Sequence, residues 1–298
     1  MTASRIEFSP PAKINLALAV RGRRDDGFHE IESWVVKLDW TDRLWLAPSD
    51  ALTLEISGAG ADSAIGVPGG PDNLVCKAAI AMAQAANRPA EVAIQLTKFI
   101  PAGAGLGGGS SDAACTLIGL NELWNLNWSV ERLAELGAAL GSDVPFFLHR
   151  GPMFMAGRGE RLSALTMNKA FWVCLILPPF PLSTADVYRA WAACGSAGAT
   201  APRSLSPKGP APLSTAAALA DQLFNDLEAP AFALSPALNA LHKTLDGLRG
   251  VRVRMTGSGS TLFAIFDDRE SAEDWRQTAF GCCHDATRFQ IVQMQTWA

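Results

Sequence analysis

A glycine-rich segment near the middle of the chain is the clearest candidate for chemistry. It reads PAGAGLGGGSS from Pro101 to Ser111, and most residues between 103 and 109 are glycine. Glycine lets the backbone take positive φ angles and approach a ligand closely, and amides at the start of a helix attract an anion such as a phosphate. Because two serines then lead into an amphipathic helical pattern, the segment predicts a phosphate-binding loop and not a plain flexible turn.

Three well-known phosphate loops fit this segment poorly. GAGLGG satisfies the dinucleotide pattern G-x-G-x-x-G, but the residues before it alternate between apolar and polar, which is typical of a half-buried strand and not of a buried parallel one. A Walker A loop needs lysine where Gly109 stands, and a protein-kinase loop has valine where Ser110 stands. The segment is therefore a phosphate loop of another kind.

Two charged residues outside the loop are candidates for catalysis. Asp143 precedes Val144 and Pro145, where a short helix can start, so its carboxylate either caps that helix or serves as a general base for a hydroxyl. Near a helix N-terminus and a lysine it would stay ionised at pH 7, as a base must. Lys13 lies on a predicted strand and is either a snorkelling surface residue or the partner of such a base.

Composition excludes several classes of protein. The chain has 298 residues and a formal net charge of -4, which is too mildly acidic for a general nucleic-acid binder or a polybasic membrane-surface protein. Its longest strongly apolar run, 171–177, is far shorter than the roughly 20 residues that span a bilayer. The N-terminal segment lacks the layout of a signal peptide. We therefore predict a cytoplasmic protein that acts on a small molecule, with no nucleic-acid or membrane partner.

The cysteines do not indicate a metal or disulfide framework. The chain has 6 cysteines and no C-x-x-C motif, which predicts reduced and mostly buried thiols. Cys282, Cys283 and His284 could form half of a metal site, but no matching second pair is visible. We therefore predict no metal held by protein ligands alone.

The elements that must position these residues mix strands and helices. In the first half, the pattern predicts strands within 6–8, 12–20, 31–46 and 92–96 and helices over 73–86, 111–124 and 130–140. In the second half, it predicts strands over 171–177, 251–255, 262–266 and 288–294, helices over 221–232, 236–248 and 271–280, and a mobile surface loop over 192–220. The strands look antiparallel, which favours an α+β fold over a doubly wound parallel sheet. A shift in composition near residue 168 predicts two domains, 1–167 and 168–298.

Taken together, the motifs resemble those of the GHMP small-molecule kinases. PAGAGLGGGSSDAA is similar to the family's nucleotide loop, and PAKINLAL, GSDVPFF and MTGSGSTLFAIF complete the set. These motifs spread over most of the chain. The resemblance implies an N-terminal domain like domain 2 of ribosomal protein S5 and a C-terminal ferredoxin-like α/β sandwich. It also implies an ATP-dependent phosphorylation of a small alcohol, with Mg2+ arriving with the ATP.

The resemblance assigns roles to individual residues. Asp143 would take the proton of the substrate hydroxyl, while Lys13 would orient Asp143 and offset charge on the transferred phosphoryl. Asn73 and Lys98 would contact the nucleotide, although Asn73 could equally cap a helix and Lys98 could equally be a solvated charge at a strand end. Nucleotide contacts would also come from the loop residues Pro101, Gly103, Gly105, Leu106, Gly107, Gly108, Gly109, Ser110 and Ser111. Either of the two serines is a candidate hydroxyl contact for Mg2+.

The turn DDGFH resembles a branch of the family whose substrate carries a cytosine. Phe28 would stack on the base and His29 would bind its edge, although lone aromatics at such positions more often belong to a core. The second stacking ring would be Tyr188, with Phe180 as a rival. The remaining predicted substrate-side residues are Asn15, Thr184, Gly257 and Ser258.

Other functions stay open at this point. The turn TGSGS would support the substrate side, but it is equally typical of a hairpin turn. The substrates of homoserine and mevalonate kinases carry no base that could stack on the DDGFH turn, so this turn distinguishes them from a substrate with a cytosine. A catalytically silent nucleotide-binding relative would not need both Lys13 and Asp143. The sequence leaves the choice between a monomer and a homodimer open.

Overall fold

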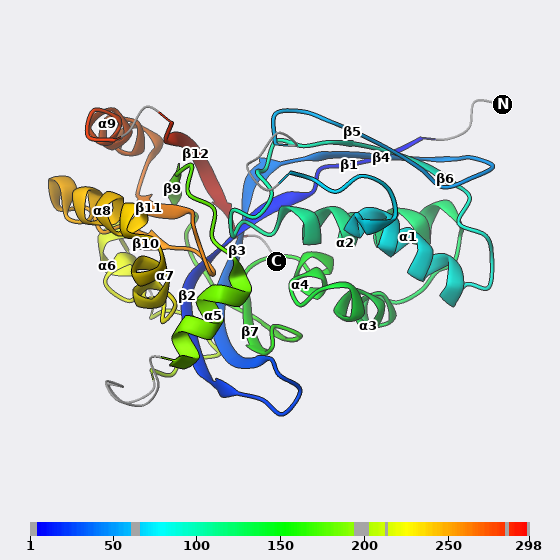
Figure 1. The fold of residues 1–298 in the computed structure, drawn as a ribbon, viewed down its shortest axis with the longest axis horizontal. Coiled ribbons are helices and arrows are strands. Elements are labelled where there is room, and N and C mark those ends of the chain that lie inside the picture. Colours follow the sequence, from blue (N-terminus) through cyan, green and yellow to red (C-terminus); the bar gives the residue numbers. More distant parts are fainter. Residues whose placement is uncertain (1–4, 61–65, 194–202, 212–213, 284–285, 297–298) are drawn as a thin grey trace. The chain divides into compact units, whose positions relative to one another are not determined.

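A computed structural model describes residues 5–60, 66–193, 203–211, 214–283 and 286–296 (Figure 1). The chain forms two compact units. The first unit comprises Met1–Ala12, Trp40–Ala102 and Gly107–Arg150, and the second comprises Lys13–Asp39, Gly103–Leu106 and Gly151–Ala298. Each unit therefore combines separate stretches of the chain. The predicted division between 167 and 168 falls inside the second unit and stays a prediction.

The first unit contains a four-stranded sheet in the order β1-β4-β6-β5. Its strands are β1 (Ile6–Phe8), β4 (Arg43–Pro48), β5 (Thr53–Ser57) and β6 (Val92–Thr97). Neighbours are antiparallel except β5 and β6, which are parallel. In β6, Val92, Ile94 and Leu96 are buried while the residues between them are not, which confirms the half-buried strand. The edge strand β5 was not predicted, because its residues are mostly exposed and few are apolar.

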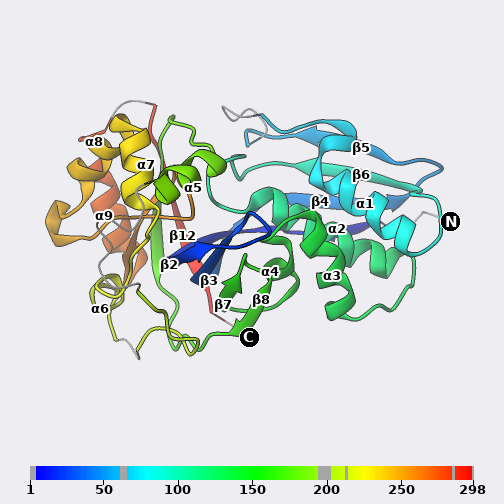
Figure 2. The same cartoon turned by 60° about the horizontal axis from the view of Figure 1, so that its bottom comes forward.

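Helices cover one face of this sheet (Figure 1 and Figure 2). They are η1 (Gly70–Asp72), α1 (Leu74–Ala85), α2 (Gly108–Leu123), α3 (Val130–Leu140) and α4 (Val144–Leu148). The first, second and third predicted helices are confirmed as α1, α2 and α3. Capping side chains explain where several helices of both units begin, because a side-chain oxygen satisfies a backbone amide of the first turn. The caps are Asn73 for α1, Ser129 for α3, Thr215 for α6, Ser235 for α8 and Asp268 for α9.

The second unit contains an eight-stranded sheet, with the order β10-β11-β9-β12-β3-β7-β8 and β2 paired to β3. Its strands are β2 (Pro11–Arg23), β3 (His29–Thr41), β7 (Met153–Gly157), β8 (Arg161–Ala164), β9 (Trp172–Leu177), β10 (Arg254–Met255), β11 (Leu262–Phe266) and β12 (Arg288–Gln295). The ladders along the path are antiparallel. The predicted α+β class is confirmed.

The helices of the second unit enclose its main core. They are α5 (Thr184–Ala193), α6 (Ala216–Ala220), α7 (Glu228–Leu234), α8 (Pro236–Leu245), the short η2 (Leu248–Gly250) and α9 (Arg269–Phe280). Helix α9 packs against β9, β11 and β12, and α5 packs against α7 (Figure 2). Trp275 of α9, Leu241 of α8 and Ile176 of β9 belong to one buried cluster.

The structure corrects parts of the second-half prediction. The helix expected over 221–232 begins only at Glu228, because Asn225 forms a bridge with Leu18 and its side chain bonds to backbone carbonyls instead. The expected surface loop over 192–220 contains α6, of which Ala216, Leu219 and Ala220 are buried; residues 194–202 and 212–213 lie outside the described part. The strand expected over 251–255 is reduced to β10, since the Val253 amide donates to Asp246.

Strands β7 and β8 and helix α5 were not predicted. Helix α8 ends at Leu245, three residues before the predicted end, and is followed by η2. In each case the sequence segment is short, and its periodicity is too brief to distinguish strand, helix and loop.

Candidate active site

The glycine-rich segment is a loop that leads directly into a helix. Gly103, Gly105 and Gly107 have φ angles of 67°, 76° and 70°, which favour glycine. A side chain at Gly105 would place its Cβ only 2.9 Å from the carbonyl oxygen of Thr256, so the loop approaches this backbone closely. Helix α2 begins at Gly108, earlier than predicted, and its first amides are available to an anion.

The two halves of the loop belong to different units. Gly103–Leu106 lies in the second unit, where the Leu106 carbonyl accepts a hydrogen bond of 2.9 Å from the Lys13 amide. The residues from Gly107 onward lie in the first unit, where Ser111 is fully buried and its hydroxyl has no hydrogen-bond partner among the described residues. Ser110 is half-buried, and Pro101 is buried.

Lys98 is the centre of a buried ionic network in the first unit. Its ammonium donates to Asp42 and, at 2.6 Å, to Asp112, and all three side chains are at most 3% exposed. The other oxygen of Asp42 accepts the amides of Phe99 and Ile100, at 2.6 and 2.9 Å. The network therefore fixes the chain just before the phosphate loop. The alternative that Lys98 is a solvated charge is wrong.

Burial and charge shift the protonation of this network. Burial alone would lower the pKa of Lys98, but the two carboxylates outweigh it and raise this pKa above its usual value. Burial raises the pKa of Asp112 to about 7, with Lys98 opposing the shift. Sequence reasoning missed both acids. The available signal was a carboxylate, Asp112, inside a run of small helical residues, because a buried charge needs a partner.

Asn73 caps a helix, as one of the two sequence interpretations held. Its side-chain oxygen accepts the Val75 amide at 2.9 Å, and its amide group donates to the Pro68 carbonyl at 2.8 Å. The side chain is buried. A contact from Asn73 to a nucleotide stays a prediction.

Lys13 lies in a polar cluster of the second unit. It is 5% exposed, so the alternative of a snorkelling surface lysine is wrong. Its ammonium donates to Asn15 Oδ1 at 2.6 Å, and the Asn15 amide group donates to Ser33 Oγ at 2.8 Å. The backbone of Asn15 donates to Thr256 Oγ1 at 2.9 Å. The strand β2 therefore presents Lys13 and Asn15 together, beside the turn between β10 and β11.

That turn is a hairpin turn, and it carries Gly257 and Ser258. A Cβ at Gly257 would lie 3.7 Å from Lys13 Nζ, which places the turn directly against the cluster. Asn225, which sequence reasoning missed, donates to the carbonyls of Met255 and Gly257, both at 2.8 Å. The hydroxyls of Ser258 and Thr184 are 2.8 Å apart. The structure thus brings four of the predicted substrate-side residues to one part of the second unit. They are Asn15, Thr184, Gly257 and Ser258.

The predicted base-binding residues lie on two elements of the second unit. Phe28 is 47% exposed in the turn just before β3, so the alternative of a core residue is wrong. The rings of His29 and Tyr188 are stacked at 4.9 Å, and Trp191 meets His29 edge-on at 5.5 Å. Tyr188 and its rival Phe180 are both partly buried against the main core of this unit.

His29 has an unused polar atom. Its Nε2 is buried and has no hydrogen-bond partner among the described residues. Burial, aided by the positive charge of Arg23, lowers the pKa of the ring. A neutral imidazole with an unpaired nitrogen is suited to bind the edge of a nucleobase.

Asp143 occupies the N-cap position of α4 in the first unit. Its backbone is in the right-handed helical region, and its side chain makes no capping hydrogen bond. The interpretation as a helix-capping side chain is therefore wrong. The carboxylate is half-buried, and the apolar residues that follow it in α4 are buried. Asp143 thus belongs to the first unit, whereas Lys13 belongs to the second.

The cysteines add no further residue to this site. Cys76, Cys115 and Cys174 are buried thiols, as predicted, whereas Cys282 is exposed. Cys194 and His284 lie outside the described residues, so the half-site at 282–284 is not described as a whole.

Within the described parts of the chain, no helix is long and apolar enough to cross a membrane.

Comparisons with known proteins agree with the motifs. The model of the GHMP kinases N terminal domain matches residues 50–151, and the GHMP kinases C terminal model matches residues 212–278. A 4-diphosphocytidyl-2-C-methyl-D-erythritol kinase of a Geobacter species is 38% identical over 271 residues, which cover 90% of this chain and 92% of the relative. The enzyme of that name from Pelotomaculum thermopropionicum is 41% identical over 264 residues, or 88% of this chain and 89% of the relative.

Solved structures show the same likeness. A crystal structure of 4-(cytidine 5'-diphospho)-2C-methyl-D-erythritol kinase superposes with a TM-score of 0.73 at 32% identity, covering 98% of this chain and 100% of that one. A homoserine kinase from Cytophaga hutchinsonii reaches a TM-score of 0.68 at 16% identity, covering 99% of this chain and 96% of that one. The second likeness concerns the fold alone.

Proposed function

The chain belongs to the GHMP kinase family, and on this premise we propose how its residues share one reaction. It is a kinase that uses ATP to phosphorylate the 2-hydroxyl of 4-diphosphocytidyl-2-C-methyl-D-erythritol, giving the 2-phosphate and ADP, in the non-mevalonate isoprenoid pathway. The structure has the two-domain α+β fold of that family. Homoserine and mevalonate kinases share this fold but lack the identity over the whole chain that the cytidyl kinases have.

Asp143 acts as the general base. It accepts the proton of the 2-hydroxyl as the oxygen of that hydroxyl attacks the γ-phosphorus of ATP, and ADP leaves with the electron pair of the broken bond. Its half-buried position at the start of α4, directly before residues that are themselves buried, supports this role.

Lys13 offsets the charge that develops on the transferred phosphoryl and orients Asp143. The observation that carries the proposal is its position: a buried ammonium bonded to Asn15, on a residue whose own amide holds the Leu106 carbonyl of the phosphate loop. A buried charge interacts strongly with developing charge because little water screens it. Asn15 keeps the ammonium in place and contacts the methylerythritol part of the substrate.

The phosphates of ATP bind to the amides of the loop and of the first turn of α2. The buried hydroxyl of Ser111, which has no partner among the described residues, fits a ligand for Mg2+. Bound there, the ion would neutralise charge on the phosphate oxygens. Asn73 and Lys98 complete the nucleotide side, with Lys98 acting from within its ionic network.

The cytosine of the substrate stacks on Phe28, with Tyr188 as the second ring, and its edge bonds to His29. The exposed ring of Phe28 and the unpaired Nε2 of His29 support this assignment. Thr184, Gly257 and Ser258 line the rest of the substrate side. The enzyme acts on this small molecule in the cytoplasm and needs no nucleic-acid partner.

An ADP-release assay tests the substrate. The cytidyl alcohol, homoserine and mevalonate are offered at equal concentration, and only the cytidyl alcohol should release ADP well above background. Comparable turnover of either other alcohol would contradict the substrate assignment.

The variant Asp143→Asn tests the base. Asparagine fills the same volume but cannot take the proton, so kcat should fall about 10²–10⁴-fold while ATP still binds. Asp274→Asn, on the exposed side of α9, is the matched control and should keep full activity. A kcat above about a third of wild type in Asp143→Asn would remove Asp143 from this role.

A further inference from the structure

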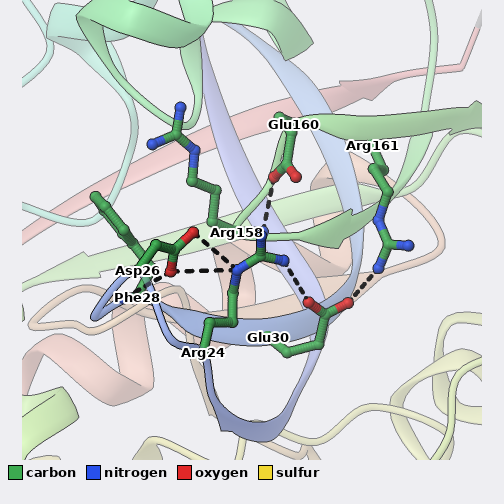
Figure 3. A network of polar contacts seen from close by, with 7 residues as sticks. All are labelled: Arg24, Asp26, Phe28, Glu30, Arg158, Glu160 and Arg161. Carbon is green, nitrogen blue, oxygen red and sulfur yellow. Dashed lines mark hydrogen bonds and ion pairs between the residues drawn. The ribbon is translucent and has the colours of Figure 1, made fainter.

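Arg158, in the turn between β7 and β8, lies over the exposed ring of Phe28 (Figure 3). The guanidinium carbon is 5.0 Å from the ring centroid, within the range of a cation–π contact. A planar guanidinium that lies over a ring covers one of its two faces. Only the opposite face of Phe28 therefore stays open to another flat group.

Hydrogen bonds within the preceding turn hold the backbone of Phe28 in place. Its amide donates to Asp26 Oδ1 at 3.1 Å, and its carbonyl accepts the Arg24 amide at 2.8 Å. The Arg24 side chain in turn bonds to Asp26 at 3.1 Å and to Glu30 at 2.7 Å. The turn 24–28 is thereby closed around the residue that carries the ring.

The turn that carries Arg158 is fixed as well. Its amide donates to Glu160 Oε2 at 2.7 Å, and Gly157 before it has a φ of 74°. A Cβ at Gly157 would fall 2.5 Å from the Glu160 carboxylate, so the turn is closed tightly. Glu30 bonds both to Arg24 and to Arg161, and so joins the two turns (Figure 3).

These charged residues do not bury the apolar side chain beside them. Figure 3 shows three arginines and three acids, with the half-exposed ring of Phe28 at one side of them. Surface ion pairs contribute little to stability, so their effect here is to hold a geometry. The ion pairs hold the turn that carries Phe28, and Arg158 contacts the ring itself.

On the basis of the function proposed above, we propose that Arg158 is a positioning residue that sets specificity for the cytosine-bearing substrate. By covering one face of Phe28, it fixes the plane of the ring and directs the base to the other face. A preorganised ring loses less freedom when the base binds, which lowers the KM for the cytidyl substrate. Neither ATP binding nor the chemical step depends on it.

Steady-state kinetics of single and double variants test this role. Arg158→Gln should raise the KM for the cytidyl substrate about 2–5-fold, the range expected for an exposed cation–π contact, with kcat and the KM for ATP unchanged. Arg158→Lys keeps a cation over the ring and should restore most of the loss. In a Phe28→Ala background, Arg158→Gln should have no further effect, because the ring on which it acts is gone.

Arg269→Gln is the matched control. Arg269, an exposed arginine of α9, also lies over an aromatic ring, that of Trp172 at 5.6 Å. The variant Arg269→Gln should leave the KM for the cytidyl substrate unchanged. Calorimetric titration with cytidine 5'-diphosphate, which carries the base but lacks the methylerythritol part with the hydroxyl that is phosphorylated, should give the same order of variants without turnover.

Two results would overturn the role of Arg158. One is an unchanged KM in Arg158→Gln while Phe28→Ala raises it strongly; the other is an equal effect of Arg158→Gln with and without the Phe28 ring. An unchanged KM in a folded Phe28→Ala enzyme is a different result. It would remove Phe28 from the proposed cytosine site, and the role of Arg158 with it.

Discussion

Two ionic networks hold the backbone beside Lys98 and the turn 24–28, and they differ in burial. In the first unit, Lys98, Asp42 and Asp112 are at most 3% exposed. In the second unit, the side chains of Arg24 and Glu30 are 33% and 31% exposed. Removing one partner of a buried pair leaves an uncompensated charge and costs about 3–5 kcal/mol, whereas an exposed pair contributes about 0–1 kcal/mol. The buried network therefore supports the fold of its unit, while the exposed one holds the turn that carries Phe28 with little effect on stability.

The largest expected effect comes from breaking the buried network. Lys98→Met leaves the side chains of Asp42 and Asp112 buried without the ammonium that both accept. The free energy of unfolding should fall by about 3–5 kcal/mol in urea titrations without nucleotide. Lys77→Met, at an exposed lysine of α1, is the control and should stay within about 0.5 kcal/mol of wild type. A loss below about 1 kcal/mol in Lys98→Met would contradict the comparison.

The two networks should also respond to pH in opposite ways. The folded-state pKa of Asp112 is raised to about 7 from an ordinary 3.8, so between these values the folded chain binds more protons than the unfolded one. Its contribution to stability is thus fully present below about pH 4 and is lost as the pH rises through 7, with a slope of up to about 1.4 kcal/mol per pH unit. Wild type should lose stability relative to Asp112→Asn between pH 5 and 8, measured by urea titration at each pH. A constant difference would argue against the raised pKa, and Asp50→Asn serves as the exposed control.

The acids of the exposed network have the opposite shift. Desolvation acts to raise the pKa of Asp26, but the Phe28 amide and Arg24 outweigh it and lower this pKa. The pKa of Glu30 is lowered in the same way, by Arg24 and Arg161 against desolvation. Their contributions are present above the ordinary carboxyl pKa and are lost only as the pH falls through the lower folded-state values. Between pH 5 and 8 this network should therefore add no slope.

A ring that is oriented and not buried should affect binding without affecting stability. Phe28→Ala should raise the KM for the cytidyl substrate about 5–150-fold, because base stacking contributes roughly 1–3 kcal/mol. Its thermal melting should stay close to wild type, since the ring is half exposed. Phe28→Tyr keeps the ring face and should be nearly neutral. A clear fall in melting temperature with equal losses for both substrates would show a structural role instead.

The smallest effect is expected from the exposed network itself. Glu30→Gln removes one charge that two arginines share, and it should cost no more than about 1 kcal/mol. The cost should shrink in 1 M salt, where the Debye length is only about 3 Å. Glu273→Gln, in the exposed pair with Arg269, should behave in the same way. A cost that is large and independent of salt would show that the two networks do not differ as described.

Local signals made the phosphate loop predictable, but they did not extend to its surroundings. Alternating glycines before a helical pattern predicted the loop and α2, and DDGFH predicted an aromatic site. The same reasoning gave Lys98 an even chance of being solvated, because its partner Asp42 comes from another element, 56 residues away in the chain. Arg158 and Asn225 were missed for the same reason, since only the fold brings them to Phe28 and Gly257.

Errors in the predicted elements have a related cause. The segment 221–232 has a helical composition, but the backbone near Asn225 pairs with Leu18 of β2 and gives up helical bonds. Tertiary contacts outweigh propensity at such positions. Helix α6, expected as loop, is short and becomes stable through its cap at Thr215 and its buried face.

The pairing of β3 with β12 determines when the second unit can be completed during synthesis. Leu38 lies opposite Met294, so the middle of the eight-stranded sheet joins residues from the two far ends of the chain. While the ribosome is still making the C-terminal part, Lys37 and Leu38 of β3 lack their β12 partners, and this stretch of strand edge can pair with other chains. Such distant pairing also slows folding, because a long loop must close first. Separate fragments cut at 167/168 would place β3 and β12 on different pieces, and neither piece would contain the whole sheet.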